Sequence, residues 1–289
     1  MHTMKRMSLQ AMRLALPTII GLIGVLGRVD AAVVVVSPSS MGSWAFNHRD
    51  ANGLPDSSAN GVGAMVNGPA APPLGTGSAN LATGDGALNG DGSQELRNTS
   101  YAGVKLSSIT SLSYSTYATL NNGQQFPYLA LEIDPCDGNV CTGADGSYRM
   151  FFEPPYQTPS SGNPFLPDQG ASVLNGWQTW DALAGGWWSN NGDGGTPGTG
   201  VQALSAFLAL HPDAQLANTA GGLGAVQFRV GFGDQLDVFN GYVDNFTIGI
   251  DGVDTTYDFE ATVVPVPAAA WLFGSALGLL GLRRRTSTG

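Results

Sequence analysis

The stretch Tyr128-Leu129-Ala130-Leu131-Glu132-Ile133-Asp134 decides the fold class, because its side chains alternate with a period of two residues. Consecutive side chains of a β-strand point to opposite faces, so Leu129, Leu131 and Ile133 share one face. The other face carries Tyr128, Ala130, Glu132 and Asp134. The stretch is therefore predicted to be a strand with one buried, apolar face.

The same alternation recurs along the chain. Val226, Phe228, Val230 and Phe232 lie opposite Gln227 and Arg229, and Phe246, Ile248 and Ile250 lie opposite Asn245 and Thr247. Further strands are predicted over 112–119, 147–152, 177–183 and 255–259. Many short strands separated by turn residues are typical of an antiparallel β-sandwich of the jelly-roll type.

Two other segments of this domain, which covers 32–262, have a different character. A short helix is predicted where Thr199 caps a turn, Pro212 ends it, and an apolar stripe lies between them, formed by Val201, Leu204, Phe207 and Leu208. Residues 51–92 are rich in Gly, Pro, Asn, Ser and Asp, which predicts a long irregular segment.

The charge of the chain restricts its partners. Between Ala32 and Pro267 only five Lys and Arg residues stand against 21 Asp and Glu residues, a formal charge of −16. Phosphate backbones would repel such a chain, so the composition argues against a nucleic-acid partner.

Residues 1–31 have the three parts of a secretory signal peptide. Basic residues come first, an uncharged run from Leu14 to Leu26 follows, and small residues precede the predicted cleavage between Ala31 and Ala32. The alternative is a transmembrane anchor, but a bilayer core needs about 20 apolar residues and this signal helix is shorter. We therefore expect export and removal of the segment by signal peptidase.

Residues 263–289 form a second distinct segment. An uncharged run over 268–282 follows a Pro motif and is followed at once by Arg283, Arg284 and Arg285. A helix of this length spans about 22 Å, which suits a transient transmembrane insertion better than a permanent one. A buried core helix is the alternative, but the three cations favour the cytoplasmic side of a membrane.

This order of Pro motif, apolar helix and arginine cluster resembles the PEP-CTERM sorting signal of exported bacterial proteins. The residues that carry the resemblance are Val264, Pro265, Val266, Pro267, Trp271, Phe273, Arg283, Arg284 and Arg285. The family has a Glu where Val266 stands. The resemblance implies recognition and cleavage by exosortase, with passage through the inner membrane to the cell surface or extracellular matrix.

The domain has two cysteines, Cys136 and Cys141, separated by a turn sequence. In an oxidising compartment such a close pair is predicted to form a small disulfide loop. A structural zinc site is the alternative, but it needs four ligands and the mature region adds only His48 and His211.

Glu132 and Asp134 are the sharpest enzymatic candidates, because alternate residues of one strand lie on the same face about 6.6 Å apart. The strand also resembles the Glu-x-Asp-x-x-Glu strand of laminarinase-type glycosidases, with Asp137 where that family has its acid/base Glu. The other interpretation is that both are ordinary exposed acids of an acidic domain. We prefer this one and expect a non-catalytic protein. A purely structural envelope protein that assembles through its sheet edges is a further alternative.

Four tryptophans, Trp177, Trp180, Trp187 and Trp188, lie within twelve residues. Flat aromatic faces suit sugar rings, but Trp also fills sandwich cores, and core packing is the interpretation that we prefer for the group as a whole. Trp187 and Trp188 are the predicted exposed pair, because Gly185-Gly186 and Asn190-Asn191 suggest a loop. They are the candidate residues for binding extracellular polysaccharide.

Three segments together resemble lectin-type and carbohydrate-binding jelly rolls: 92–96, the strand near Trp177, and 242–246. Acidic loops in such a domain suggest calcium, which prefers oxygen ligands. The candidate donors are Asp244 above all, with Asp85, Asp91, Asp137, Asp145 and Asp193. No cofactor other than this calcium is expected.

Overall fold

The computed structural model describes residues 32–49, 62–84, 92–136, 148–218, 225–231 and 238–262. The predicted signal peptide, its cleavage site at Ala31 and the whole sorting tail from Val264 to Arg285 lie outside these residues. Within the described ranges, no helix combines the length and apolar character needed to cross a membrane.

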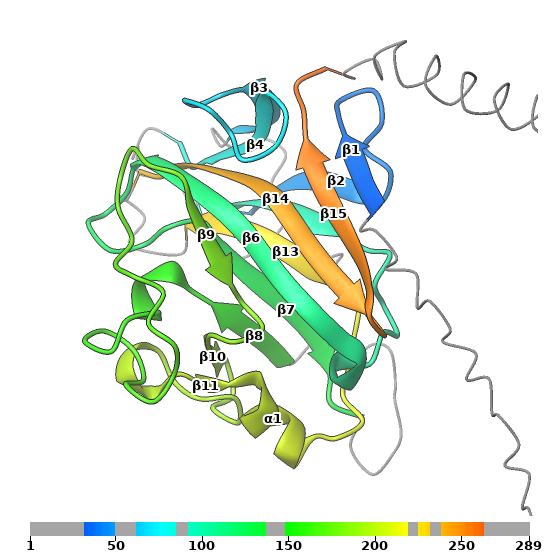
Figure 1. Ribbon diagram of the computed structural model, residues 1–289, viewed down its shortest axis with the longest axis vertical. Helices are drawn as coiled ribbons and strands as arrows, with labels where there is room; N and C mark the ends of the chain where they lie inside the picture. Colours follow the sequence, from blue (N-terminus) through cyan, green and yellow to red (C-terminus); the bar gives the residue numbers. More distant parts are fainter. Residues whose placement is uncertain are drawn as a thin grey trace, which may run out of the picture. The chain divides into compact units, whose positions relative to one another are not determined.

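Two β-sheets account for most of the described chain, and they form the predicted β-sandwich (Figure 1). In the first sheet the strand order is β1-β15-β14-β4-β3, with β6 on β14 and β9 on β6. These strands are β1 (Ala32–Val36), β15 (Val253–Phe259), β14 (Asn240–Ile250), β4 (Gly77–Ala82), β3 (Val62–Asn67), β6 (Ile109–Leu120) and β9 (Gln178–Asp181). All neighbours pair antiparallel except β1 and β15, which are parallel.

The second sheet has the order β11-β10-β8-β7-β13-β5-β2, and β12 pairs with β7. In Figure 1 it lies behind β6 and β14. Its strands are β11 (Gln202–Ala203), β10 (Gly186–Ser189), β8 (Tyr148–Phe152), β7 (Tyr128–Asp134), β13 (Val226–Gly231), β5 (Ser93–Asn98), β2 (Trp44–Arg49) and β12 (Gln215–Leu216). The strand predicted over 128–134 is therefore confirmed, in the interior of this sheet.

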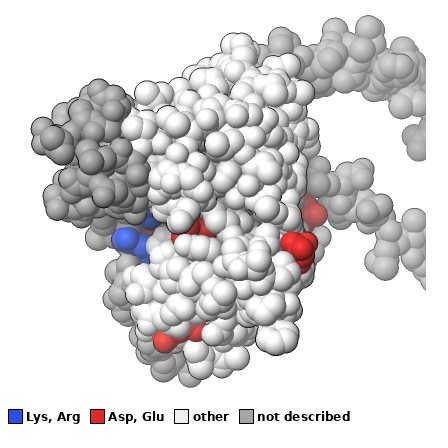
Figure 2. Space-filling view, turned by 90° about the vertical axis from the view of Figure 1, so that its left-hand side faces the viewer, with Lys and Arg blue, Asp and Glu red and all other residues white. Residues whose placement is uncertain are grey.

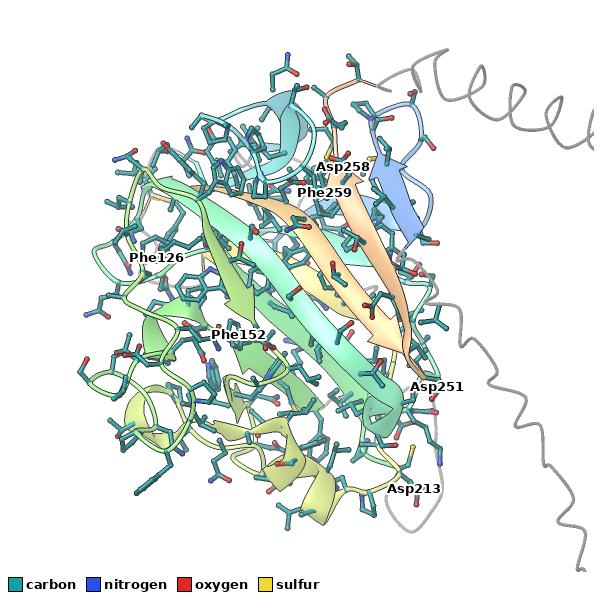
Figure 3. The ribbon with its side chains drawn as sticks, viewed as in Figure 1. Phe126, Phe152, Asp213, Asp251, Asp258 and Phe259 are labelled. Atoms are coloured by element: carbon teal, nitrogen blue, oxygen red, sulfur yellow. The ribbon has the colours of Figure 1, made fainter. Side chains whose placement is uncertain are left out.

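Aromatic side chains from both sheets form the core between them. Phe228 of β13 contacts Phe246 of β14 with ring centroids 5.0 Å apart, and Trp44 of β2 stacks on Phe228 at 6.0 Å. Figure 3 labels Phe152 and Phe259, which are fully buried from opposite sheets. The apolar faces predicted from the alternation thus meet in one core.

The described chain contains one α-helix, α1 (Leu204–Leu210), and three short 3₁₀ turns, η1 (Leu106–Ser108), η3 (Pro154–Tyr156) and η4 (Gly198–Gly200). The predicted stripe is confirmed at Leu204 and Phe207, which are buried. The predicted cap is wrong: α1 begins after Ala203, and Thr199 lies in η4 instead. The helix is one turn shorter than predicted because 202–203 pair with β10 as strand β11.

The irregular segment predicted over 51–92 is also corrected, because β3 and β4 lie within it. Their small residues carry little strand propensity, but β4 pairs with β14 and directs Ala79 and Leu81 into the core. Asn80 on the other side donates from Nδ2 to Asn240 Oδ1 at 2.7 Å. Tertiary pairing therefore forms strands that local composition does not indicate.

Strand β14 is interrupted by a bulge. The register with β6 shifts between Asp244 and Thr247, and Asn245 has a positive φ of 53°. A bulge re-aims the side chains on either side of it. As a result Val243 and Phe246, which strict alternation would send to opposite faces, both pack in the core, and Asp244 between them is fully buried as well.

Candidate functional site

Four of the five Lys and Arg residues between Ala32 and Pro267 lie on one face of the second sheet. We call this the outer face, because its side chains point away from the core. The four are Arg49 of β2, Arg97 of β5, Arg149 of β8 and Arg229 of β13. The fifth, Lys105, pairs with Asp213 at 3.0 Å near α1. Figure 2 shows that charged residues are sparse on the face turned toward the viewer. The visible Lys and Arg atoms lie together at one place, with Asp and Glu atoms nearby.

Strand pairing explains how residues far apart in the sequence meet on this face. Across the sheet, Arg229 of β13 is paired with Glu95 of β5 on one side and with Tyr128 of β7 on the other. In the next row, Phe151 of β8 is paired with Ala130 of β7 and with Trp188 of β10. Phe228 points to the core, so its neighbours in β13 must point outward.

A buried ionic network lies at the β2 side of this face. Arg49 Nε donates to both oxygens of the Glu95 carboxylate, at 2.9 Å to Oε1 and 3.0 Å to Oε2. A terminal nitrogen of Arg229 lies 2.8 Å from Glu95 Oε1. All three side chains are at least 95 % buried. A buried charge is strongly destabilising unless an opposite charge compensates it. The Glu95 carboxylate provides this compensation for both arginines and so fixes their positions. Glu95 was not predicted as a site residue, because its only signal in the sequence is its alternation with Ser93 and Arg97.

Glu132 and Asp134 lie on the outer face as predicted, but the interpretation that they are exposed acids is wrong. Glu132 is fully buried and Asp134 is 2 % exposed. Glu132 Oε1 contacts Arg149 Nε at 3.4 Å, and Asp134 Oδ1 accepts the Cys136 backbone N–H at 2.9 Å. Alternation predicts which face of a strand a side chain lies on, whereas the solvent exposure of that face depends on the tertiary structure.

A pocket of about 260 Å³ opens on the outer face, and we call it the Trp188 pocket. Trp188 stacks on Phe151 with ring centroids 4.3 Å apart and planes inclined by 25°. Its indole Nε1 donates to Glu153 Oε1 at 2.9 Å. The lining consists of Gln125, Tyr128, Arg149, Phe151, Glu153, Trp188, Arg229 and Gly231. The pocket therefore combines an aromatic floor with two guanidinium groups and one carboxyl group.

The tryptophan prediction is corrected in one half. Trp187 is fully buried, and its Nε1 donates to the Ala182 carbonyl at 2.8 Å, so it is a core residue. Residues 186–189 form strand β10 rather than a loop, so Trp187 and Trp188 point to opposite faces. Trp180 is also in the core, and Trp177 donates to the Pro69 carbonyl at 3.0 Å.

Burial changes the acidity of two groups in the Trp188 pocket. Burial raises the pKa of Glu153 to about 7, although the hydrogen bond from Trp188 lowers it in part. Burial also raises the pKa of Tyr128 to about 12. Near neutral pH the Glu153 carboxyl group can therefore carry a proton, so it can donate as well as accept a hydrogen bond.

A second, more polar hollow of about 530 Å³ adjoins the first. The two share Gln125 and Glu153 in their linings. The second is bounded by segments 122–125 and 155–161, with Ala171 and Ser172. The shared residues place both hollows side by side, so an extended ligand can occupy both.

Asp244, the foremost calcium candidate, is fully buried in the first sheet. Its carboxylate accepts the backbone N–H groups of Leu74 at 2.9 Å and Phe259 at 3.2 Å. Burial raises the pKa of Asp244 to about 7. Among the described residues, no group of three or more His, Cys, Asp or Glu side chains is arranged to hold a metal ion.

The remaining candidates fall mostly outside the described part of the chain. Asp193 contacts His211 Nε2 at 3.2 Å. Cys136 is buried at the end of β7, and Cys141 is not described, so the disulfide stays a prediction. Asp85, Asp91, Asp137 and Asp145 also lie outside the described residues.

Comparisons with known proteins add no relative. No family model matches the chain, and no match was found among curated proteins or among solved structures.

Proposed function

We propose that this chain is an exported bacterial cell-surface or extracellular-matrix protein that binds polysaccharide without catalysis. In this proposal signal peptidase and exosortase process its ends, and its jelly-roll domain is the part that remains. The binding site is the Trp188 pocket. The observation that carries the proposal is the Phe151–Trp188 aromatic platform flanked by Arg149, Arg229 and Glu153.

The chemistry of the pocket supports a sugar ligand. Sugar rings have apolar C–H faces that pack on aromatic rings and polar edges that need hydrogen-bond partners. Trp188 and Phe151 supply the aromatic rings. The hydrogen-bonding groups come from Arg149, Glu153 and Gln125. The volume lies just below the range of about 300–1,000 Å³ for small-molecule sites, which suits one sugar unit.

The adjoining hollow supports a polymer rather than a free monosaccharide. A chain whose one unit packs on Trp188 can place its next units beyond Gln125, against the polar side chains of Thr158 and Ser161. Polymer binding through several weak contacts also requires no deep cavity.

Isothermal titration of the full-length protein in mild detergent tests this site, with a panel of neutral and acidic extracellular polysaccharides. We expect at least one polymer to bind and Trp188→Ala to weaken binding at least tenfold. Phe165→Ala is the control, because Phe165 is 93 % exposed and lies outside the pocket. Binding by no polymer, or equal binding by wild type and Trp188→Ala, would contradict the proposal.

Mass spectrometry tests the processing separately. Surface material should contain a chain that starts at Ala32 and ends near the Pro motif at 264–267. An intact tail ending at Gly289 in that material would exclude exosortase cleavage, and it would leave the sugar-binding proposal untouched.

A secreted glycosidase that uses Glu132 and Asp134 is the second candidate, favoured by their common face on β7. Neither residue lines the Trp188 pocket, and each carboxylate already has a partner. Binding without hydrolysis is therefore the better-supported function. Hydrolysis of β-glucans by the wild type, lost in Glu132→Gln, would reverse this preference.

A further inference from the structure

The end of β15 carries two carboxylates that meet the loop between β3 and β4. Asp258 belongs to β15, Glu260 follows it, and both lie against Gly75 in that loop. A β-carbon at Gly75 would be 3.2 Å from Asp258 Oδ1 and closer still to Glu260 Oε1. The two oxygens are therefore separated by less than the diameter of a calcium coordination sphere, about 5 Å.

One of these oxygens accepts no hydrogen bond from the described part of the chain. Asp258 is 9 % exposed, and its Oδ1 is buried without a hydrogen bond among the described residues. Glu260 differs, because its oxygens accept the backbone N–H of Thr76 at 2.7 Å and the Thr76 hydroxyl at 3.2 Å. An unpaired, buried carboxylate oxygen is unfavourable, and a bound cation would relieve this cost.

The surroundings of Asp258 are acidic. In the described part of the chain, no Lys or Arg forms an ion pair with Asp258, Glu260 or Asp244. Burial raises the pKa of Asp258, and the charge of Glu260 raises it further. The same Asp258 charge adds to the burial that raises the pKa of Asp244. A cation beside Asp258 would offset all of these effects.

We propose that Asp258 and Glu260 bind one divalent cation of the calcium type at the β3–β4 loop. The donors are oxygens alone, which calcium prefers and zinc does not. Two carboxylates are fewer than a preformed cage needs, so backbone carbonyls and water complete the shell, as calcium allows. The site lies on the first sheet, not on the outer face of the second, and it is independent of the proposed sugar binding.

Calcium titration calorimetry of the EDTA-treated full-length protein tests this site. We expect one calcium ion to bind per chain and Asp258→Asn to weaken the affinity at least tenfold. Asp251→Asn is the matched control: it removes the same charge, at an exposed turn at the opposite end of β15 (Figure 3). The control should bind as the wild type does.

Thermal unfolding provides a second measurement. Calcium should raise the melting temperature of the wild type and of Asp251→Asn, but not that of Asp258→Asn. Should Asp258→Asn fail to fold, Glu260→Gln must show the same loss. Absence of any calcium response in the wild type, or an affinity of Asp258→Asn within twofold of it, would overturn the proposal. An equal response to magnesium chloride would overturn the assignment to calcium.

Discussion

Removing the charge of Glu153 should make the protein less sensitive to pH. Glu153 lines the Trp188 pocket and is 7 % exposed, and burial raises its pKa from 4.5 to about 7. Between these two values the folded chain holds a proton that the unfolded chain has released. The contribution of Glu153 to stability therefore falls as the pH rises through this window and is constant on either side of it.

The size of the effect follows from the pKa shift. Each unit corresponds to 1.36 kcal/mol, so the whole window amounts to about 3 kcal/mol and the interval from pH 5 to pH 8 to about 2.5 kcal/mol. Glu153→Gln cannot titrate, but its amide oxygen can still accept the hydrogen bond from Trp188. The variant should lose about 2.5 kcal/mol less than the wild type over this interval.

Urea unfolding at pH 5 and pH 8, followed by tryptophan fluorescence in the presence of EDTA, measures the difference. Asp244 shifts in the same direction, so the wild type and Glu153→Gln both keep its contribution and the comparison isolates Glu153. Asp251→Asn should follow the wild type, because Asp251 is exposed. Equal pH dependence of the wild type and Glu153→Gln would refute the assignment of a raised pKa to Glu153.

Three further predictions concern stability. Phe228→Ala should lower the free energy of unfolding by about 3–5 kcal/mol, because Phe228 is fully buried, whereas Phe165→Ala should change it by less than about 0.5 kcal/mol; urea unfolding compares the two. Glu95→Gln should cost about 3–5 kcal/mol in the same assay, because two buried arginines lose their carboxylate. Thr116→Val should cost about 1–3 kcal/mol and shift the fluorescence of Trp180, whose buried Nε1 donates to the Thr116 hydroxyl at 2.8 Å.

The sequence predicted those strands whose alternation involves large apolar residues. Strands β7, β13 and β15 fall where the pattern placed them. Strands β3 and β4 were missed, because Gly, Ala, Ser and Asn carry the composition of loops and only pairing with β14 makes them strands. Strand β10 was missed for a related reason: the flanking Gly and Asn pairs indicated a loop, although both Trp187 and Trp188 pair with β8.

The candidate site was predicted in part. The sequence identified Trp188 as a candidate, but it predicted that Trp187 would be exposed beside it. In a strand, neighbouring side chains point to opposite faces, so Trp187 points into the core. Phe151, Arg149 and Arg229 join Trp188 only through strand pairing across the sheet. Strand register is a tertiary property, so no local pattern reveals which of these residues become neighbours.

The register of the second sheet also links the stability of the fold to the pocket. A slip of one residue in β13 would turn Arg229 into the core and Phe228 onto the outer face. Glu95 opposes this slip, because it satisfies the buried Arg229 only when the two residues lie side by side. Arg229 in turn lines the Trp188 pocket. The buried carboxylate that fixes the register therefore also places a guanidinium group of the proposed binding site, so a substitution at Glu95 should weaken binding even though Glu95 does not line the pocket.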